Sequence, residues 1–503
     1  MIMKSKYYIY TGAILLGLGT MASCKKSFLE VQPKGQFQQS DYYANPDQAF
    51  AAVVAAYDPL VTETGGIDNT YSSPVGELNS ASDDCFAGGG SSSDIPAWQA
   101  INNYTISANV GPHNQLWAIN FQGVNRTDVL LQELPKVPGL SADLLKRYTA
   151  EGKFLRAHYY FDLVRLFKNV PLILSTLNLN NVFDQQQATP EAVYAQVESD
   201  LKDAIDGLPV TVVASTDGGR ATKGAAQALL GKVYLYEKNW KAAADMLNTV
   251  NTSGTYKLLT NYGDIFSPKN KFNSESIFEW VHSGTQSYTW SNWDQFKSSI
   301  YVQMVGPRSY TGPIYYSGGY GFNPVTTELA NAMKGDPRYG YTIVNIDSLT
   351  KATKTSYSPS YQNTGYFIQK YAPINANKVT SGITDLNWPN DYIEIRLADT
   401  YLMEAEADLN GGAGGTSRAQ TLLDAVRARV GLPSVPATLQ NIYNERRLEL
   451  ATEGHRWFDL VRWGQAPTAL AFKGFKAGIN EILPIPLNET LNGSKVKQNP
   501  GYN

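Results

Sequence analysis

The sequence contains few of the side-chain patterns on which enzyme chemistry depends. Its four histidines, His113, His158, His282 and His455, include no pair with metal-ligand spacing. It lacks a glycine-rich phosphate loop and a GxSxG nucleophile motif. We therefore expect a protein that is not an enzyme, with no cofactor and no metal, although a structural calcium ion is left open. For His158 and His455 we favour a structural role.

Two groups of acidic residues have alternative interpretations. Glu404, Glu406 and Asp408 could suggest carboxylate catalysis. Glu404 and Asp408 are four residues apart and share a helix face, so pairing with arginines is the favoured interpretation. Asp83 and Asp84 could bind an ion or sugar hydroxyls, but a turn or capping role is favoured.

Aromatic residues in irregular segments are the strongest functional signal. The chain has 32 Tyr and 9 Trp, and many of the tyrosines stand among Gly, Ser and Asn, where core packing explains them poorly. Sugars combine apolar C–H faces with many hydroxyls. A carbohydrate site therefore needs flat aromatic platforms rimmed by polar side chains.

Two such platforms are predicted. Trp98 stands near Asp94, Gln99, Asn102 and Asn103, and the pair Trp290 and Trp293 stands near Asn292, Asp294 and Gln295. The alternative is that each Trp packs beneath its own loop. The candidate ligand-binding residues are the aromatic Trp98, Trp290, Trp293, Tyr71 and Tyr320 and the polar Asp68, Asn102 and Asp294. Five tryptophans in regular elements are expected in the core: Trp117, Trp240, Trp280, Trp457 and Trp463.

Helical patterns must position these loops. Helices are predicted at 46–61, 114–134, 141–167, 190–208, 322–333, 392–410 and 417–430, with a strand at 276–281. Residues 222–250 predict a helix pair with tetratricopeptide spacing, in which small residues such as Gly231 let two helices approach. Residues 62–112 show no helical period and are expected to form an ordered loop surface.

The segment NERRLELATEGHRWFDLVRWG at 444–464 combines charge with large apolar side chains. Its pentapeptide FDLVR also occurs at 161–165. On one helix face Arg456, Asp459 and Arg462 are three apart, so we expect two ion pairs. Gly454 predicts a bend or a close contact. We interpret the segment as a structural clasp for the C-terminal helices.

The N-terminus indicates export. Lys4 and Lys6 precede an apolar run, and Met-Ala-Ser-Cys at 21–24 resembles a bacterial lipobox. We expect residues 1–23 to be a lipoprotein signal peptide, Cys24 to be acylated, and 24–45 to be a linker; an ordinary cleaved signal or an uncleaved anchor is the alternative. Cys85 is the other cysteine, so no disulfide framework is expected. The net charge of -3 argues against nucleic-acid binding.

Several longer stretches together resemble the SusD/RagB family of nutrient-uptake lipoproteins. They are FLRAHYYFDLVRLFKNVPL at 154–172, AAQALLGKVYLYEKNW at 225–240, IRLADTYLMEAEA at 395–407, VRARVGLP at 426–433, the 444–464 segment and LPIPLNETLNGSKVKQNPGY at 483–502. The resemblance implies a mainly α fold, a tetratricopeptide-like scaffold of about four helix pairs with an irregular ligand-binding part and a few short strands. It divides the chain into a SusD-like repeat part at 46–270, with its loop insertion at 62–112, and a RagB/SusD part at 271–503.

The resemblance also implies a function. It predicts a cell-surface protein, held to the outer membrane by lipid, that captures a glycan and delivers it to a SusC-like TonB-dependent β-barrel transporter. Peptide uptake, a purely structural scaffold and an unrecognised glycosidase are the alternatives. The family's ligand residues are poorly fixed in sequence, so the candidate site depends on the aromatic argument alone.

Overall fold

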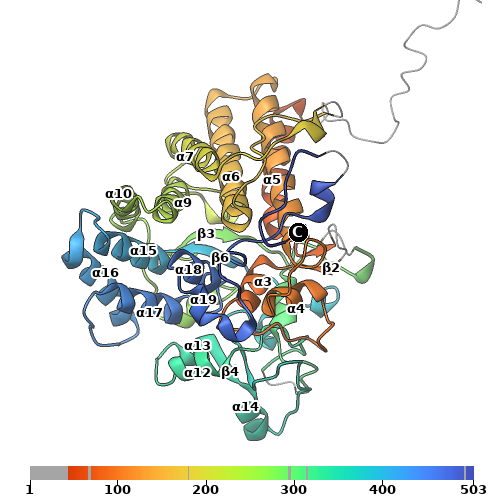
Figure 1. Ribbon diagram of the computed structural model, residues 1–503, viewed down its shortest axis with the longest axis vertical. Helices are drawn as coiled ribbons and strands as arrows, with labels where there is room; N and C mark the ends of the chain where they lie inside the picture. The colour runs from red at the N-terminus through yellow and green to blue at the C-terminus, as the bar shows by residue number, and fades with distance from the viewer. Residues whose placement is uncertain are drawn as a thin grey trace, which may run out of the picture.

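The computed structural model describes residues 43–65, 70–178, 181–292, 296–312, 315–491 and 494–502. Helices dominate these residues (Figure 1). Their bounds are α2 Pro46–Tyr57, α3 Pro74–Ala81, α4 Pro96–Asn102, α5 His113–Glu133, α6 Ala142–Phe167, α7 Pro190–Gly207, α8 Ala214–Asp217, α9 Lys223–Tyr236, α10 Trp240–Asn251, α11 Ile300–Val305, α12 Thr327–Ala332, α13 Tyr339–Thr342, α14 Ile346–Thr353, α15 Leu397–Leu409, α16 Gly415–Arg429, α17 Leu439–Glu449, α18 Arg456–Arg462 and α19 Ala466–Ala469. No helix of the described part is long and apolar enough to cross a membrane.

A helical array runs through the molecule. Helix α5 packs on α6, α6 on α7, α7 on α9, α9 on α10, α10 on α15 and α15 on α16. A Cβ on Gly231 would lie 2.6 Å from Leu247 Cγ, so only glycine lets α9 and α10 approach this closely. The tetratricopeptide-like scaffold predicted from the sequence is confirmed.

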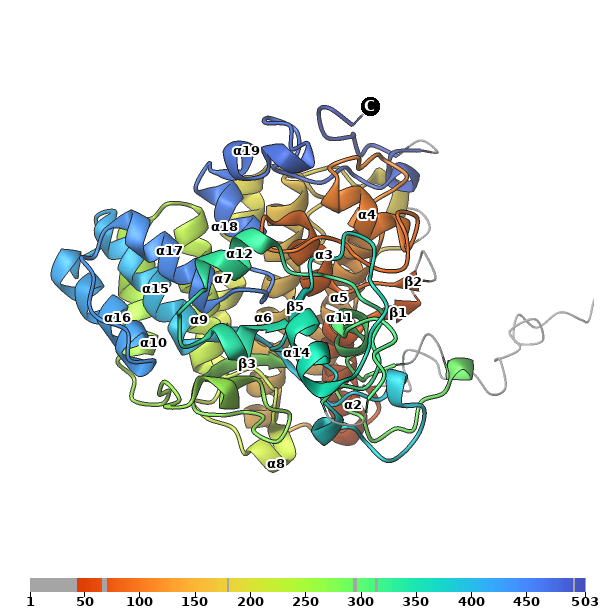
Figure 2. The same cartoon turned by 90° about the horizontal axis from the view of Figure 1, so that it is seen from below.

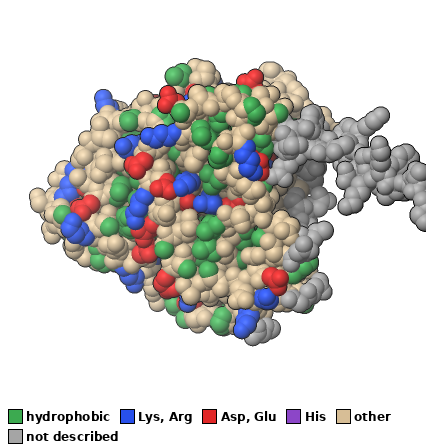
Figure 3. Space-filling view, turned by 90° about the horizontal axis from the view of Figure 1, so that it is seen from above, with side chains coloured by type: hydrophobic (Ala, Val, Ile, Leu, Met, Phe, Trp, Pro, Cys, Tyr) green, Lys and Arg blue, Asp and Glu red, His purple; other side chains and the backbone are tan. Residues whose placement is uncertain are grey.

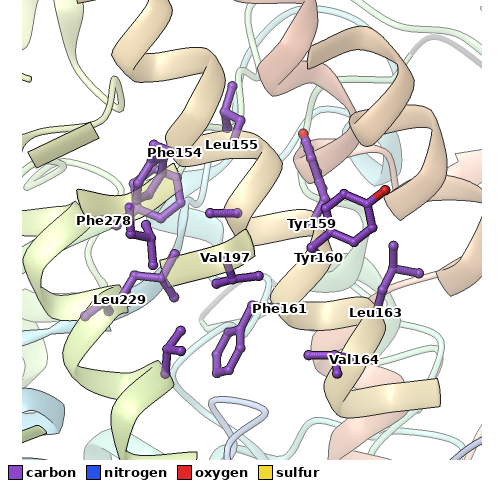
Figure 4. Packing of buried hydrophobic residues seen from close by; sticks show 14 of the residues in the cluster. Phe154, Leu155, Tyr159, Tyr160, Phe161, Leu163, Val164, Val197, Leu229 and Phe278 are labelled. Carbon is purple, nitrogen blue, oxygen red and sulfur yellow. The ribbon is translucent and has the colours of Figure 1, made fainter. Parts of the chain in front are cut away.

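The main core surrounds α6. Ser141 caps this helix by accepting a hydrogen bond from the Leu144 backbone N–H. Phe154 and Phe161 of α6 are fully buried and lie near Val197 of α7 and Leu229 of α9 (Figure 4). Burying each such Phe stabilises the fold by about 1.5–3 kcal/mol.

The described residues form three two-stranded antiparallel sheets. They are β1 (Thr64–Gly65) with β2 (Thr70–Tyr71), β3 (Ser276–Trp280) with β6 (Tyr392–Arg396), and β4 (Ile343–Asn345) with β5 (Tyr366–Ile368). The β3–β6 pair contacts helices α9 and α15 of the array. The predicted strand at 276–281 is confirmed as β3. The helix predicted at 392–410 begins only at Leu397, because the preceding five residues pair with β3.

Residues 62–112 also differ from the sequence-based expectation. They contain the short helices α3 and α4, each with proline at its first position. Nearly every residue of α3 is buried, polar ones included, so its sequence carries no apolar period. Much of the segment is therefore interior structure rather than open loop.

The 444–464 segment forms two helices, α17 and α18, separated at Gly454, whose φ is +79°. Arg462 donates to Asp459 at 2.7 and 2.9 Å, as predicted. The predicted Arg456–Asp459 ion pair is wrong, because Arg456 instead donates two 2.8 Å hydrogen bonds to Asp83.

The two FDLVR copies meet in space. The guanidinium of Arg165 lies 4.2 Å from the ring centroid of Phe161 and 4.1 Å from that of Phe458. The repeated pentapeptide therefore joins α6 to α18. This contact fits the interpretation of the C-terminal segment as a clasp.

A buried network of charges holds the same region. Glu445, Glu449 and Glu453 are four residues apart and almost fully buried. Glu449 accepts hydrogen bonds from Arg338 at 2.8 Å and Arg396 at 2.6 Å. The other cations bound to the three glutamates are Arg427, Arg429 and Lys370. Elements far apart in sequence are thereby fixed to one another.

Candidate functional site

A pair of tyrosines from distant segments forms the centre of the candidate site. Tyr71 ends β2, and Tyr320 stands in the irregular segment between α11 and α12. Their ring centroids are 6.0 Å apart, with an angle of 52° between the ring planes. Both side chains are half-buried. The Tyr320 hydroxyl donates a 3.2 Å hydrogen bond to Asp385 Oδ2.

An arginine and a second carboxylate flank the tyrosine pair. Arg308 Nη1 donates to the Tyr320 carbonyl at 3.2 Å. A Cβ on Gly90 would lie 2.9 Å from Arg308 Nη2, so Gly90 lets the guanidinium lie directly against the backbone here. Asp94 accepts a 2.6 Å hydrogen bond from the Gly90 backbone N–H, and its charge helps raise the pKa of Tyr71.

Trp290 lies on the same edge of the molecule. It begins the short helix η7 (Trp290–Asn292), and 48% of its surface is exposed. The preceding Tyr288 accepts a hydrogen bond from Ile383 N at 3.3 Å and donates its own N–H to Asn387 at 2.9 Å. These bonds hold Tyr288, two residues before Trp290, against the segment that carries Asp385. In Figures 1 and 2, β2, the green turn of η7 and the cyan 384–386 turn lie on the same side of the molecule, and in Figure 2 the green turn projects outward beyond β2.

Burial sets the protonation states in this cluster. It raises the pKa of Tyr320, with Tyr71 and Asp385 adding to the effect, so the hydroxyl stays neutral and can donate. Burial also raises the pKa of Asp385, while the Tyr320 hydrogen bond opposes that shift. The cluster therefore offers aromatic faces, hydroxyls, carboxylates and a guanidinium within one surface.

Trp98 is not part of this surface. Its side chain is 0% exposed and lies edge-on to Phe322, with ring centroids 5.2 Å apart. A Cβ on Gly76 would lie 2.1 Å from the indole, so Trp98 fills a space that only glycine leaves open. The predicted Trp98 platform is wrong, and the alternative, packing beneath its own loop, is correct.

Asn102 is likewise interior. It is 1% exposed, and its Oδ1 accepts hydrogen bonds from Ala87 N at 3.1 Å and Lys473 Nζ at 3.0 Å. The prediction that Asn102 contacts ligand is therefore wrong. Its amide instead fixes the turn that precedes it.

Four of the predicted residues lie outside the described part of the chain: Cys24, Asp68, Trp293 and Asp294. Tyr71, Tyr320 and Trp290 are brought to one edge. Asp385 and Arg308 are the residues that sequence reasoning missed. Each stands alone in its segment, and no spacing pattern connects them to the tyrosines.

The acidic residues considered for catalysis have structural partners. Arg418 donates to Glu404 at 2.7 Å, and Arg462 donates to Glu406. Asp408 accepts from the Gly414 backbone N–H rather than from an arginine. Asp83 and Asp84 bind Arg456 and Arg447. Within the described residues, no cluster of His, Cys, Asp and Glu could hold a metal ion.

The two histidines expected to be structural, His158 and His455, are both buried. His158 is buried and faces both carboxylate oxygens of Glu394 at 2.8 and 2.9 Å. Burial lowers the pKa of His455 to about 4, so it is neutral at pH 7.

On the face drawn in Figure 3, acidic and basic side chains are interspersed, with no single-sign field that would attract a polyanion.

Comparison with known families assigns the chain. Residues 232–502 match the SusD family, and residues 27–235 match a family described as starch-binding and associating with the outer membrane. The protein belongs to the SusD family.

Its relatives include proteins named for glycan binding. A laminarin-binding SusD-like protein is 46% identical, with a TM-score of 0.86 over 92% of this chain and 100% of its own. Surface glycan-binding protein A from Bacteroides thetaiotaomicron, solved with laminarihexaose, is 27% identical, with a TM-score of 0.82 over 90% of this chain and 99% of its own. SusD-like protein P25 of Formosa agariphila is 24% identical over 93% of each chain.

Proposed function

We propose that this protein is a non-catalytic glycan-binding protein whose ligand is a laminarin-type glucan, bound at the Tyr71–Tyr320–Asp385 surface. The observation that carries the proposal is the tilted tyrosine pair with its hydrogen-bonded carboxylate. Apolar sugar faces pack against the rings, while Asp385 accepts from sugar hydroxyls. Trp290, half exposed nearby, extends the aromatic surface.

Similarity supports the choice of glucan. The 46% identical relative is named for laminarin, and the B. thetaiotaomicron relative was solved with laminarihexaose. Tyrosines inclined at 52° form an angled surface, which fits a curved chain better than a flat ribbon. A β-1,3-linked glucan curves, whereas a β-1,4-linked glucan is extended.

Affinity electrophoresis against laminarin, starch and hydroxyethylcellulose tests the proposal. The protein is expected to be retarded by laminarin and to migrate normally in hydroxyethylcellulose, whose β-1,4 backbone is the matched control. Retardation by starch alone would mean that the ligand is a starch-type glucan rather than a laminarin-type glucan. Normal migration in all three gels would contradict the proposal.

Two of the alternatives give different results. A peptide ligand predicts saturable binding of oligopeptides and none of glucans, and recognition by charge or backbone rather than by aromatic platforms. A glycosidase predicts release of reducing sugar from laminarin by the pure protein. We expect no release, because the carboxylates considered for catalysis are occupied by arginines and backbone donors.

The family and the N-terminus support a proposal for the partner and the location. We propose that lipid on Cys24 holds the protein to the outer membrane, facing outward, and that it passes glycan to a SusC-like TonB-dependent barrel. Labelling with radioactive palmitate, compared between wild type and Cys24→Ala, tests the anchor. Co-purification of a barrel with the tagged lipoprotein tests the partner. A scaffold that only holds partner proteins would also co-purify with the barrel, but it would show no saturable glycan binding.

A further inference from the structure

A buried lysine lies behind the candidate site. Lys473 ends the short helix η10 (Ala471–Lys473) and is 7% exposed. Its Nζ donates to the Ser80 carbonyl at 2.7 Å, the Cys85 carbonyl at 2.6 Å and Asn102 Oδ1 at 3.0 Å. All three acceptors belong to one stretch, from the end of α3 to the end of α4.

The hydrogen bonds of this lysine all go to neutral oxygens. The neighbouring carboxylates are engaged elsewhere, since Asp83 binds Arg456 and Asp84 binds Arg447. Burial lowers the pKa of Lys473 to about 7, while the nearby acidic groups oppose the shift. Three acceptors require three N–H donors, which only the ammonium form provides. The ammonium thus gathers oxygens as a small bound cation would.

The gathered stretch continues directly into the candidate site. Phe86 N donates to the Pro324 carbonyl and Gly89 N to the Gly321 carbonyl, both at 2.9 Å. Tyr320 immediately precedes Gly321 in the segment that pairs with residues 86–89. On the other side, Gly90 lies beneath Arg308. The position of residues 80–90 therefore determines where the Tyr320 ring and the Arg308 guanidinium stand.

We infer that Lys473 is a positioning residue of the glycan-binding surface: its ammonium fixes residues 80–90, and these fix Tyr320 and Arg308. The inference builds on the proposed function, because it names that surface as the one that Lys473 controls. Lys473 itself lies in the interior and touches no ligand.

Two variants of Lys473 and one control separate the contribution of the ammonium group from that of the alkyl chain. Lys473→Met keeps a long side chain but removes the donors, and Lys473→Ala also leaves space for a small cation. Lys476→Met, at an exposed lysine three residues on, is the matched control. Amide hydrogen exchange at Phe86 and Gly89, and calorimetry with laminarihexaose, are measured at pH 6, below the pKa of Lys473.

The expected results follow from the lost hydrogen bonds. In Lys473→Met, exchange at Phe86 and Gly89 is expected to be about tenfold faster and laminarihexaose affinity about tenfold lower. Methylammonium chloride should restore affinity to Lys473→Ala, while sodium chloride at equal ionic strength should not. Neither salt should rescue Lys473→Met, whose side chain occupies the space. Lys476→Met should behave as wild type.

Other outcomes overturn the inference. Unchanged exchange in Lys473→Met means that the ammonium does not hold the stretch. Faster exchange with unchanged affinity means that the stretch does not position the site. If the wild type fails to bind laminarihexaose, the proposed function fails, while the exchange data still test the structural half. If both Lys473 variants fail to fold, Asn102→Ser removes one acceptor and should give smaller shifts of the same sign; no shift would contradict the role.

Discussion

At the residue scale, the candidate site combines two tyrosine rings with the Tyr320 hydroxyl and its carboxylate partner. Tyr320 donates to Asp385, so the carboxylate is oriented before any ligand arrives. A preorganised acceptor loses less conformational entropy on binding than a mobile one. The tyrosine rings can thus pack against the apolar face of a sugar while Asp385 accepts hydrogen bonds from its hydroxyls.

Replacing Tyr320 separates these contributions. Tyr320→Phe keeps the ring but frees Asp385, and we expect laminarihexaose affinity to fall by about 0.5–1.5 kcal/mol. Tyr320→Ala also removes the ring and should cost more. Calorimetry measures both. Equal affinities for wild type and Tyr320→Ala would remove this residue from the site.

Trp98 and Trp290 should respond in opposite ways to truncation. Trp98→Ala empties a buried space and should cost about 3–5 kcal/mol of unfolding free energy. Trp290→Ala should leave stability within about 0.5 kcal/mol and weaken glucan binding, since the ring is half exposed. Urea unfolding and calorimetry on both variants test this. Reduced stability in Trp290→Ala with full affinity would assign that ring to packing.

At the element scale, α17 and α18 anchor the C-terminal region. Asp459 of α18 accepts hydrogen bonds from Arg446 and Arg462, and all three groups are nearly buried. The repeated FDLVR pentapeptide adds Arg165, whose guanidinium stacks on the rings of Phe161 and Phe458. The Asp459 contacts join α17 to α18, and the Arg165 contacts join α18 to α6, about 300 residues earlier in the chain.

Asp459→Ala tests the clasp. Removing this carboxylate takes one of two partners from each buried guanidinium, since Arg446 keeps Asp399 and Arg462 keeps Glu406, and we expect a loss of about 1–3 kcal/mol in unfolding free energy. Asp245→Ala, which breaks an exposed pair with Lys241, is the matched control and should cost at most about 1 kcal/mol. Glucan affinity of the folded Asp459→Ala protein should equal that of wild type. Lost affinity without lost stability would move the site to α18.

Elements were predictable where one physical signal dominated. The α6, α9 and α10 helices follow from apolar periodicity, and Gly231 from the need for close approach. The helices within 62–112 were not predictable, because α3 buries polar side chains whose hydrogen-bond partners lie far away in the sequence. Asn79, for example, donates to the Thr452 carbonyl and to Tyr301. Residues 392–396 form a strand only because β3 pairs with them.

At the scale of the whole molecule, the buried ion network should make stability depend on pH. Arg429, Arg396 and Arg338 hold the pKa of Glu449 well below its ordinary value against the opposing effect of burial. A lowered folded pKa stabilises the native state above the unfolded pKa of about 4.3, and this contribution is lost as pH falls below it.

Glu449→Gln isolates this effect. The variant cannot ionise, so wild type should exceed it in thermal stability by a constant margin above about pH 5, and the margin should shrink below about pH 4.3. Scanning calorimetry from pH 7 to pH 3 measures the difference. A margin that grows as pH falls would contradict the assigned charge state.

The site was only partly predictable for a reason that belongs to the whole fold. Tyr71, Trp290, Tyr320 and Asp385 come from separate segments, and only tertiary packing brings them to one edge. Aromatic composition selected Tyr71, Trp290 and Tyr320 as candidates, since rings in irregular segments are a local signal. Trp98 shared that signal yet is buried, and Asp385 carried none.

The most direct test of the account is a calorimetric titration of laminarihexaose into wild type and into the double variant Tyr71→Ala/Tyr320→Ala. We expect saturable binding by wild type and loss of that binding by the double variant, with its thermal stability retained. Equal binding by the two proteins, or no binding by wild type, would contradict this expectation.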